Sequence, residues 1–200
     1  MRNKRLNMTE TPSWTYLDQL KNIVYARDDM MQILCQLFQI APDAYIAAGL
    51  IRNLVWSQLD GQPYVLAQTE ADVIYFDAKD DGIRQREIQS QLQQLFPEMT
   101  WDVVNQAYVH QWYRTDTGQM IEPLCSVEHA LSLWPETATA VALRLNAQNS
   151  LECIAPFGLQ DLFELKLRWN ASLVSHAVFA QRIQSKCFRA KWPKLQLIDA

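Results

Sequence analysis

Apolar residues recur along this 200-residue chain with two different spacings. A recurrence every three or four residues predicts amphipathic helices, and short runs of β-branched and aromatic residues predict strands. The predicted helices span residues 13–41, with Ser13 or Thr15 as the cap, then 51–59, 83–96, 126–134, 159–169 and 179–188. The predicted strands span 45–48, 72–76, 101–105 and 151–154, whereas 138–145 fits either type and 113–123 is expected to be a loop. Because strands and helices alternate, we expect a mixed α/β (α+β) fold with helical additions.

Two features of this pattern predict a chemical site. A small-residue turn at Ala48-Gly49 leads from a predicted strand into a helix, and a later strand carries Glu70 and Asp72. Residues two apart on a strand point to the same face, so these two carboxylates should lie together. Paired carboxylates hold divalent cations, and a helix N-terminus opened by glycine accepts phosphate. The pattern therefore predicts a site for a metal-bound nucleoside triphosphate.

Charge is distributed unevenly along the chain. The net charge of the whole chain is −4, but residues 1–165 hold 11 Lys/Arg and 21 Asp/Glu, whereas residues 166–200 hold 7 Lys/Arg and one Asp. Two interpretations of the basic segment stay open. It could contact phosphates of a nucleotide or of RNA, because aromatic residues alternate there with basic ones, or it could be a basic flank packed against an acidic body. The segment contains Lys186, Phe188, Arg189, Lys191, Trp192 and Lys194.

Composition argues against several other classes of protein. The four cysteines are widely spaced and form no Cys/His ligand pattern, which argues against a disulfide framework and against a structural zinc site. The basic N-terminus lacks the apolar run of a signal peptide, and no window approaches eighteen apolar residues. We therefore expect a cytoplasmic protein with no membrane span.

Six blocks of residues, in one order along the chain, carry a resemblance to a known family. They are residues 48–56 (AGLIRNLVW), 72–77 (DVIYFD), 105–107 (NQA) with His110, 134–141 (WPETATAV), 155–163 (APFGLQDLF) and 192–195 (WPKL). On these blocks the chain resembles, from about Ala41 to the C-terminus, a bacterial family of the nucleotidyltransferase superfamily, whose fold is that of polymerase beta. The resemblance implies a polymerase-beta-type core sheet with N-terminal and C-terminal helices. It implies a helical segment at 1–40 and a nucleotidyltransferase-like domain at 41–200, together forming one compact unit.

The resemblance also implies roles for individual residues. Phosphate binding falls to Ala48, Gly49, Arg52 and Asn53, although Arg52 could instead pair with a nearby carboxylate. Catalysis and metal binding fall to Glu70, Asp72 and, on a neighbouring strand, Asp102, with Mg²⁺ or Mn²⁺ as the ion. Asn105, Gln106 and His110 are candidates for contact with the base or the acceptor, or for buried hydrogen bonds, and Thr137 or Thr139 is a candidate to line the pocket.

The chain departs from the family pattern in two places. The family has Asp-Ile-Asp where this chain has Glu70-Ala71-Asp72, and it has a further glycine where Ala47 stands. Glutamate is one methylene longer than aspartate, and Mg²⁺ requires nearly ideal octahedral geometry. These two departures are therefore compatible with a site that binds metal more weakly than the family pattern would.

The resulting functional hypothesis is an Mg²⁺-dependent nucleotidyltransferase. Such an enzyme transfers a nucleoside monophosphate from an NTP to an acceptor hydroxyl on a small molecule, a protein or an RNA. The first alternative is a catalytically weakened or inactive nucleotidyltransferase-fold binding protein, which the two departures favour. The second is an RNA-associated protein that uses the basic C-terminal segment.

Overall fold

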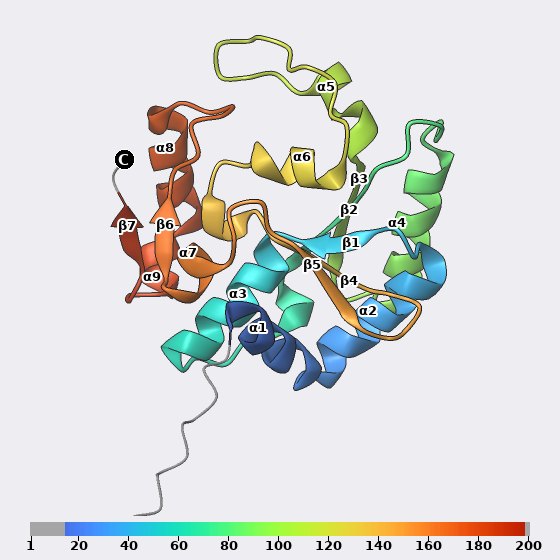
Figure 1. Ribbon diagram of the computed structural model, residues 1–200, viewed down its shortest axis with the longest axis horizontal. Helices are drawn as coiled ribbons and strands as arrows, with labels where there is room; N and C mark the ends of the chain where they lie inside the picture. Colours follow the sequence, from blue (N-terminus) through green and yellow to red (C-terminus); the bar gives the residue numbers. More distant parts are fainter. Residues whose placement is uncertain (1–14, 199–200) are drawn as a thin grey trace, which may run out of the picture.

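The computed structural model describes residues 15–198 and is built around a five-stranded mixed sheet. The strand order is β3-β2-β1-β4-β5, in which β2 and β3 are parallel and the other neighbours are antiparallel (Figure 1). The predicted strand at 72–76 lies second from the edge, and the short β1 takes the centre. The strands are β1 Tyr45–Ala47, β2 Glu70–Tyr75, β3 Thr100–Asn105, β4 Ala142–Leu145 and β5 Leu151–Ile154.

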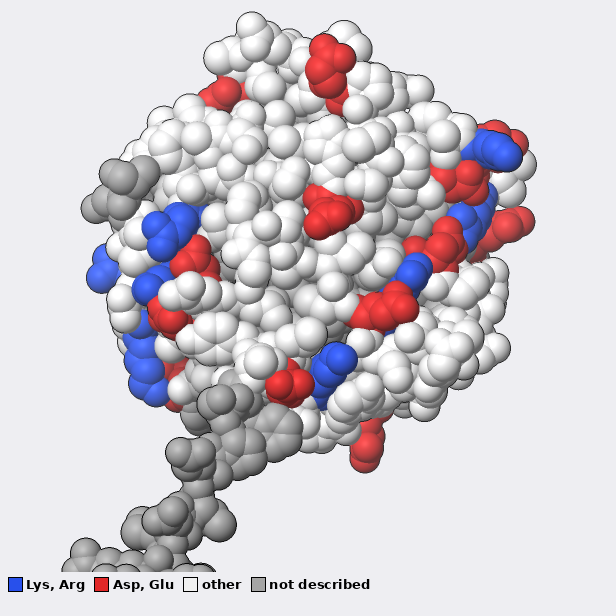
Figure 2. Space-filling model, viewed as in Figure 1, with Lys and Arg blue, Asp and Glu red and all other residues white. Residues whose placement is uncertain are grey.

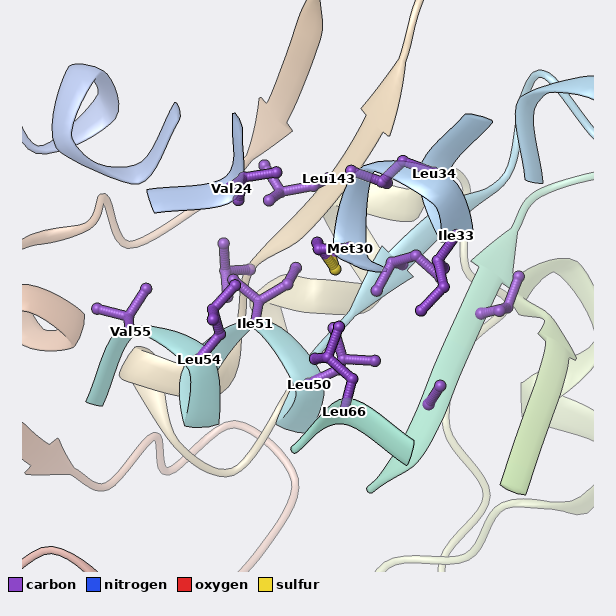
Figure 3. Close-up of a cluster of buried hydrophobic side chains, with 14 of the residues drawn as sticks. Val24, Met30, Ile33, Leu34, Leu50, Ile51, Leu54, Val55, Leu66 and Leu143 are labelled. Carbon is purple, nitrogen blue, oxygen red and sulfur yellow. The ribbon is translucent and has the colours of Figure 1, made fainter. Parts of the chain in front are cut away.

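The main hydrophobic core lies between this sheet and the helices α1, α2 and α3 on one of its faces (Figure 1). In Figure 3 the buried side chains of these helices meet Leu143 of the sheet. A fourth helix, α4, packs against β3 and α2 with Ile88 and Leu92 inward. The four helices are α1 Tyr16–Tyr25, α2 Asp28–Ile40, α3 Gly49–Asp60 and α4 Ile83–Leu95.

A smaller core covers the opposite face of the sheet. Helix α6 (Val127–Ser132), capped by the Ser126 hydroxyl, places Val127 and Leu131 against Ile74 and other apolar side chains of the strands. The short helix α5 (Val109–Trp112) and the loop that follows it extend above this face in Figure 1. The sheet therefore has a thick helical layer on one side and a thinner cover on the side where the predicted carboxylates emerge.

The C-terminal elements form a flank beside α3. Strands β6 (Lys166–Arg168) and β7 (Gln196–Ile198) pair in parallel, and between them lie α8 (His176–Lys186) and α9 (Phe188–Lys191). The Trp56 ring of α3 packs edge-on against the rings of Phe188 and Trp192, at centroid distances of 5.9 and 5.2 Å. The Trp56 Nε1–H also donates to the Leu162 carbonyl of α7 (Gln160–Phe163) at 3.0 Å. Aromatic packing thus brings the basic segment close to α3.

The predicted fold class is confirmed, but two of the predicted helices are wrong in extent. The helix expected over 13–41 is broken into α1 and α2, because Arg27 adopts an extended backbone and its side chain bonds to Asp29 and to the Tyr64 carbonyl. Thr15 caps α1 through a capping box, whereas Ser13 lies outside the described residues. The helix expected over 159–169 is only the single turn α7, since the left-handed backbone of Leu165 (φ 54°) leads into β6.

The remaining boundaries are close to those predicted, except that one further helix is broken in two. The ambiguous segment 138–145 is a 3₁₀ turn at Thr137–Thr139 followed by β4. The helix expected over 179–188 is α8 and α9, separated at Cys187, whose φ is 54°. A 3₁₀ turn at Leu66–Gln68 precedes β2, and another at Gln106–Tyr108 follows β3. Within residues 15–198, every helix is too short or too polar to cross a membrane.

Candidate functional site

The turn between β1 and α3 is a tight one. Ala48 has φ 53° and ψ −119°, a backbone conformation that glycine adopts readily and that costs energy for a residue with a Cβ atom. Ala47, where the family pattern has its further glycine, is instead a fully buried strand residue. A Cβ atom on Gly49 would lie 3.9 Å from Asp72 Oδ2 and 3.7 Å from Arg52 Nη2. The start of α3 therefore lies directly beside one of the predicted carboxylates.

The structure brings the three predicted carboxylates to one region of the sheet. Asp72 on β2 pairs in register with Asp102 on the adjacent parallel strand β3, and Glu70 precedes Asp72 by two residues on the same strand. Asp72 is half-buried, whereas Glu70 and Asp102 are exposed. In the described part of the chain, no three Asp, Glu, His or Cys side chains are already gathered around one point as a ligand set.

The electrostatics of this region favour a cation. Burial, together with the charges of Asp102 and Glu70, raises the pKa of Asp72 to about 6 against the opposing effects of the Gly49 N–H and Arg52. Burial, followed by the charge of Glu70, also raises the pKa of Asp102. Like charges held together in this way repel one another, and a divalent cation bound between them would relieve that repulsion. The oxygen donors present thus fit the chemistry of Mg²⁺ or Mn²⁺.

Arg52 is a buried residue with several partners. Its guanidinium donates to Thr139 Oγ1 at 3.1 Å and to Asn53 Oδ1 at 2.9 Å, and it lies 4.6 Å from the centroid of the Phe188 ring. Burial lowers its pKa to about 10, against the opposing charge of Glu136, which lies 3.7 Å away. The predicted alternative, in which Arg52 pairs with a carboxylate, is therefore realised. Its side chain also forms part of the wall of a cavity beside the Ala48-Gly49 turn.

Glu136 and Arg182 are two further residues of the site that the sequence did not indicate. Glu136 is fully buried, accepts a hydrogen bond from Thr139 Oγ1 at 2.6 Å and pairs with Arg182 Nε of α8. The only local signal was that Glu136 is the one charged residue of the segment 134–141. It could not name the partner, which lies 46 residues further along the chain.

Two cavities meet at Asp72. The first has a volume of about 830 Å³ and contains the start of α3, Glu70 and the basic segment. The second has a volume of about 290 Å³ and lies against Asp102 and the apolar cover of the sheet. Four residues line both cavities, namely Ala48, Asp72, Thr139 and Arg182. Glu70 therefore faces one cavity and Asp102 the other, with Asp72 between them.

The other candidates from the sequence divide between the cavities and the protein interior. Asn53 lines the first cavity and Gln106 the second. Asn105 is buried, and its side chain accepts hydrogen bonds from the backbone N–H groups of Asp77 and Ala107. It therefore stabilises the local backbone. Thr137 donates to Asp161, and His110 Nδ1 is buried without a partner among the described residues.

The basic segment forms part of the first cavity. Lys186 and Lys191 line it together with Arg182, Phe188 and Trp192. Figure 2 shows Lys and Arg gathered on the flank formed by the C-terminal elements, with few charges over the middle of the same face. The fold thus places cations from the end of the chain in the same cavity as the Ala48-Gly49 turn, Glu70 and Asp72.

Comparisons with known proteins identify the family of this chain. A family model described as Nucleotidyltransferase matches residues 38–197, and the chain belongs to this family. No curated protein matches the chain.

Solved structures support the same fold. A protein whose NMR structure reveals a CCA-adding enzyme head domain is 27% identical to this chain, with a TM-score of 0.75, and the match covers 91% of this chain and 95% of that one. A CCA-adding enzyme in complex with CTP is 13% identical, with a TM-score of 0.54. That match covers 90% of this chain but 43% of the enzyme, so it shows the fold alone.

Proposed function

We propose that this protein is an Mg²⁺- or Mn²⁺-dependent nucleotidyltransferase that transfers a nucleoside monophosphate from an NTP to an acceptor hydroxyl. The observation that carries the proposal is the position of Asp72. It lies beside the N-terminus of α3, in register with Asp102, and in the wall of both cavities. A group at this junction can contact a donor in one cavity and an acceptor in the other.

The triphosphate of the donor would occupy the first cavity. The start of α3 borders this cavity through Ala48 and Gly49, and the positive end of the helix dipole favours an anion there. Arg182, Lys186 and Lys191 line the same cavity and add positive charge. Arg52 is held rigidly by Thr139 and Asn53, so its charge is in place before a ligand arrives.

Glu70, Asp72 and Asp102 would hold the divalent ions. Bound there, Mg²⁺ or Mn²⁺ would neutralise the charge that develops on the attacking and leaving oxygens. Asp72 lies in both cavities and is the residue best placed to serve the donor side and the acceptor side at once. Glu70 borders only the donor cavity and Asp102 only the other, so we assign them to the donor and acceptor sides respectively.

The alternative of a weakened or inactive binding protein rests on two observations. Ala48 stands where the backbone favours glycine, and Glu70 reaches the site from an exposed position. Both changes would reduce catalysis more than nucleotide binding, because binding depends mainly on the N-terminus of α3 and the cations. A protein of this kind would bind Mg²⁺-NTP without releasing pyrophosphate.

Thermal unfolding in the presence of each NTP, with and without Mg²⁺ or Mn²⁺, tests the proposal. A ligand that binds only the folded state adds about 2.7 kcal/mol of stability at a hundred times its dissociation constant. We expect a metal-dependent rise of the unfolding midpoint with at least one NTP, and loss of that rise in Asp72→Asn. Glu87→Gln, which removes an exposed carboxylate on α4, is the matched control and should behave as the parent. An equal rise in the parent and in Asp72→Asn would place the nucleotide elsewhere.

Release of pyrophosphate in the presence of candidate acceptors then separates the enzyme from the binding protein. Turnover supports the proposal. Binding without turnover, combined with turnover in Glu70→Asp, would identify a weakened enzyme.

A further inference from the structure

The second cavity differs in chemistry from the first. Twelve of its eighteen lining residues are apolar, and they come from strands, helices and loops that lie far apart in the sequence. Trp112 of α5 and Trp134 after α6 supply aromatic surface, while Ile74 and Val104 form part of the wall on the sheet. The loop 113–123 adds Tyr113 and Ile121. This lining favours a ligand with an apolar or aromatic body.

Two of the three charged residues of this cavity, Asp72 and Arg182, also line the first cavity, and the third, Asp102, pairs in register with Asp72. Its only lining cation among the described residues is Arg182, whose Nε is already bonded to the buried Glu136. The other charged residues in its wall are the carboxylates of Asp72 and Asp102. A ligand here would therefore have its polar end at the carboxylates and its apolar body away from them.

Two properties of the cavity restrict the class of ligand further. Its volume of about 290 Å³ is at the lower end of the range for small-molecule pockets, which suits one ring or a short branched chain. Nucleic-acid backbones are bound chiefly through Lys and Arg, and the exposed Lys186 and Lys191 line the other cavity. The wall of the second cavity therefore suits an uncharged ligand better than an RNA end.

We propose that the second cavity binds the acceptor, and that the acceptor is a small, uncharged alcohol with an apolar or aromatic body. This inference rests on the proposed nucleotidyl transfer. The alcohol lies with its hydroxyl toward Asp102 and Asp72. Its oxygen forms a bond to the α-phosphorus of the NTP, the bond from that phosphorus to the bridging oxygen breaks, pyrophosphate leaves with the electron pair, and the hydroxyl proton passes to solvent.

Direct binding of simple alcohols tests the inference in the absence of nucleotide. The probes are para-fluorobenzyl alcohol and gem-difluorocyclohexanol, titrated into the 200-residue chain and followed by fluorine NMR. We expect saturable binding of at least one probe. Leu173→Trp, which adds bulk to the cavity wall from a loop, should weaken this binding roughly tenfold or more, equivalent to 1.4 kcal/mol. Leu197→Trp, the same substitution at an exposed position on β7, is the control and should have no effect.

The outcomes separate this inference from the proposed function. Leu173 does not line the first cavity, so the Mg²⁺-NTP midpoint rise should persist in Leu173→Trp. If Leu173→Trp does not fold, Val109→Phe on α5 takes its place. A midpoint rise with NTP but no probe binding would overturn the acceptor class alone. Tighter binding of a single-stranded oligoribonucleotide or a tyrosine-containing peptide, lost in Leu173→Trp, would assign the cavity to a macromolecule and overturn it as well.

Discussion

At the scale of single residues, the site combines strain with charge repulsion. Ala48 adopts a backbone conformation that favours glycine. The carboxylate of Asp72 is repelled by the charges of Asp102 and Glu70. Both features cost stability in the absence of a ligand. Such costs are typical of residues whose position is fixed by binding rather than by folding.

The strain at Ala48 can be measured by substitution. We expect Ala48→Gly to stabilise the protein by about 1 kcal/mol, since glycine adopts this backbone without a Cβ clash. Ala47→Gly is the matched control and should destabilise the protein by a similar amount, because Ala47 is a buried strand residue. Urea unfolding of both variants measures the difference. Stabilisation by Ala47→Gly and not by Ala48→Gly would mean that the strained residue of the turn is Ala47 and not Ala48.

The raised pKa of Asp72 predicts a specific dependence of stability on pH. A folded-state pKa near 6, against 3.8 in the unfolded chain, means that ionisation of Asp72 disfavours the folded state. With divalent ions chelated, Asp72→Asn should therefore be more stable than the parent above pH 6, by up to about 3 kcal/mol. The difference should shrink as pH falls from 6 and vanish below about pH 4, where both states of the parent are protonated.

Urea unfolding at several pH values in the presence of a chelator measures this effect. Addition of Mn²⁺ at neutral pH should make the parent more stable than Asp72→Asn, because only the parent keeps the carboxylate that binds the ion. A parent that is as stable as Asp72→Asn at pH 8 without metal would contradict the electrostatic account.

At the scale of elements, one buried ion pair fixes α8 against the rest of the site. Glu136, in the turn before β4, contacts Arg182 of α8, Thr139 and Arg52. Two arginines from different parts of the chain thus share one buried carboxylate. Removal of that carboxylate leaves both guanidiniums without their buried counter-charge.

The change Glu136→Gln should therefore destabilise the protein by about 3 kcal/mol, since one partner of a buried pair is removed. We also expect weaker Mg²⁺-NTP binding, because Arg182 lines the first cavity and would lose its fixed position. Glu98→Gln, at an exposed turn, is the control and should change stability by less than about 0.5 kcal/mol. Chemical denaturation and nucleotide titration measure the two effects. A loss of nucleotide binding at unchanged stability would mean that Glu136 acts on the ligand and not through α8.

At the scale of the whole molecule, folding brings the acidic first part of the chain and the basic C-terminal segment to the same cavity. The acidic first part supplies Glu70 and Asp72 to the first cavity, and the basic segment supplies cations to the same cavity through α8 and α9. The basic segment is thus neither a free tail nor only a packed flank. Its position favours an anionic ligand that spans the cavity.

Neutralising these cations should weaken nucleotide binding without unfolding the protein. We expect the double variant Lys186→Gln/Lys191→Gln to bind Mg²⁺-NTP about tenfold more weakly, with a shallower dependence on salt, because two charge contacts are lost. Arg189→Gln is the control, since it removes a neighbouring exposed charge that does not line the cavity. Calorimetric titration at two salt concentrations measures the effect. Equal losses in the control would indicate a general effect of net charge.

Local patterns in the sequence predicted the mixed fold class and the strands that carry Glu70, Asp72 and Asp102, whereas the family resemblance implied that these two strands are neighbours. The local predictions succeeded because each depends on residues close together in the chain. The breaks at Leu165 and Cys187 were missed, since a left-handed residue other than glycine leaves no compositional signal.

The long-range part of the site was also missed. The pairing of Glu136 with Arg182 and the two cavities exist only once distant segments pack together. A sequence can indicate that a charged residue is buried, but it cannot indicate which distant residue forms the ion pair with it.

A crystal structure of the protein with Mn²⁺ and a non-hydrolysable NTP analogue, recorded so that manganese scatters anomalously, would show directly whether Asp72 binds the metal of a metal–nucleotide complex. We predict an anomalous peak at Asp72, with the triphosphate in the first cavity between the N-terminus of α3 and the pair Lys186 and Lys191. Manganese away from Asp72, or a nucleotide whose phosphates lie outside that cavity, would contradict the account.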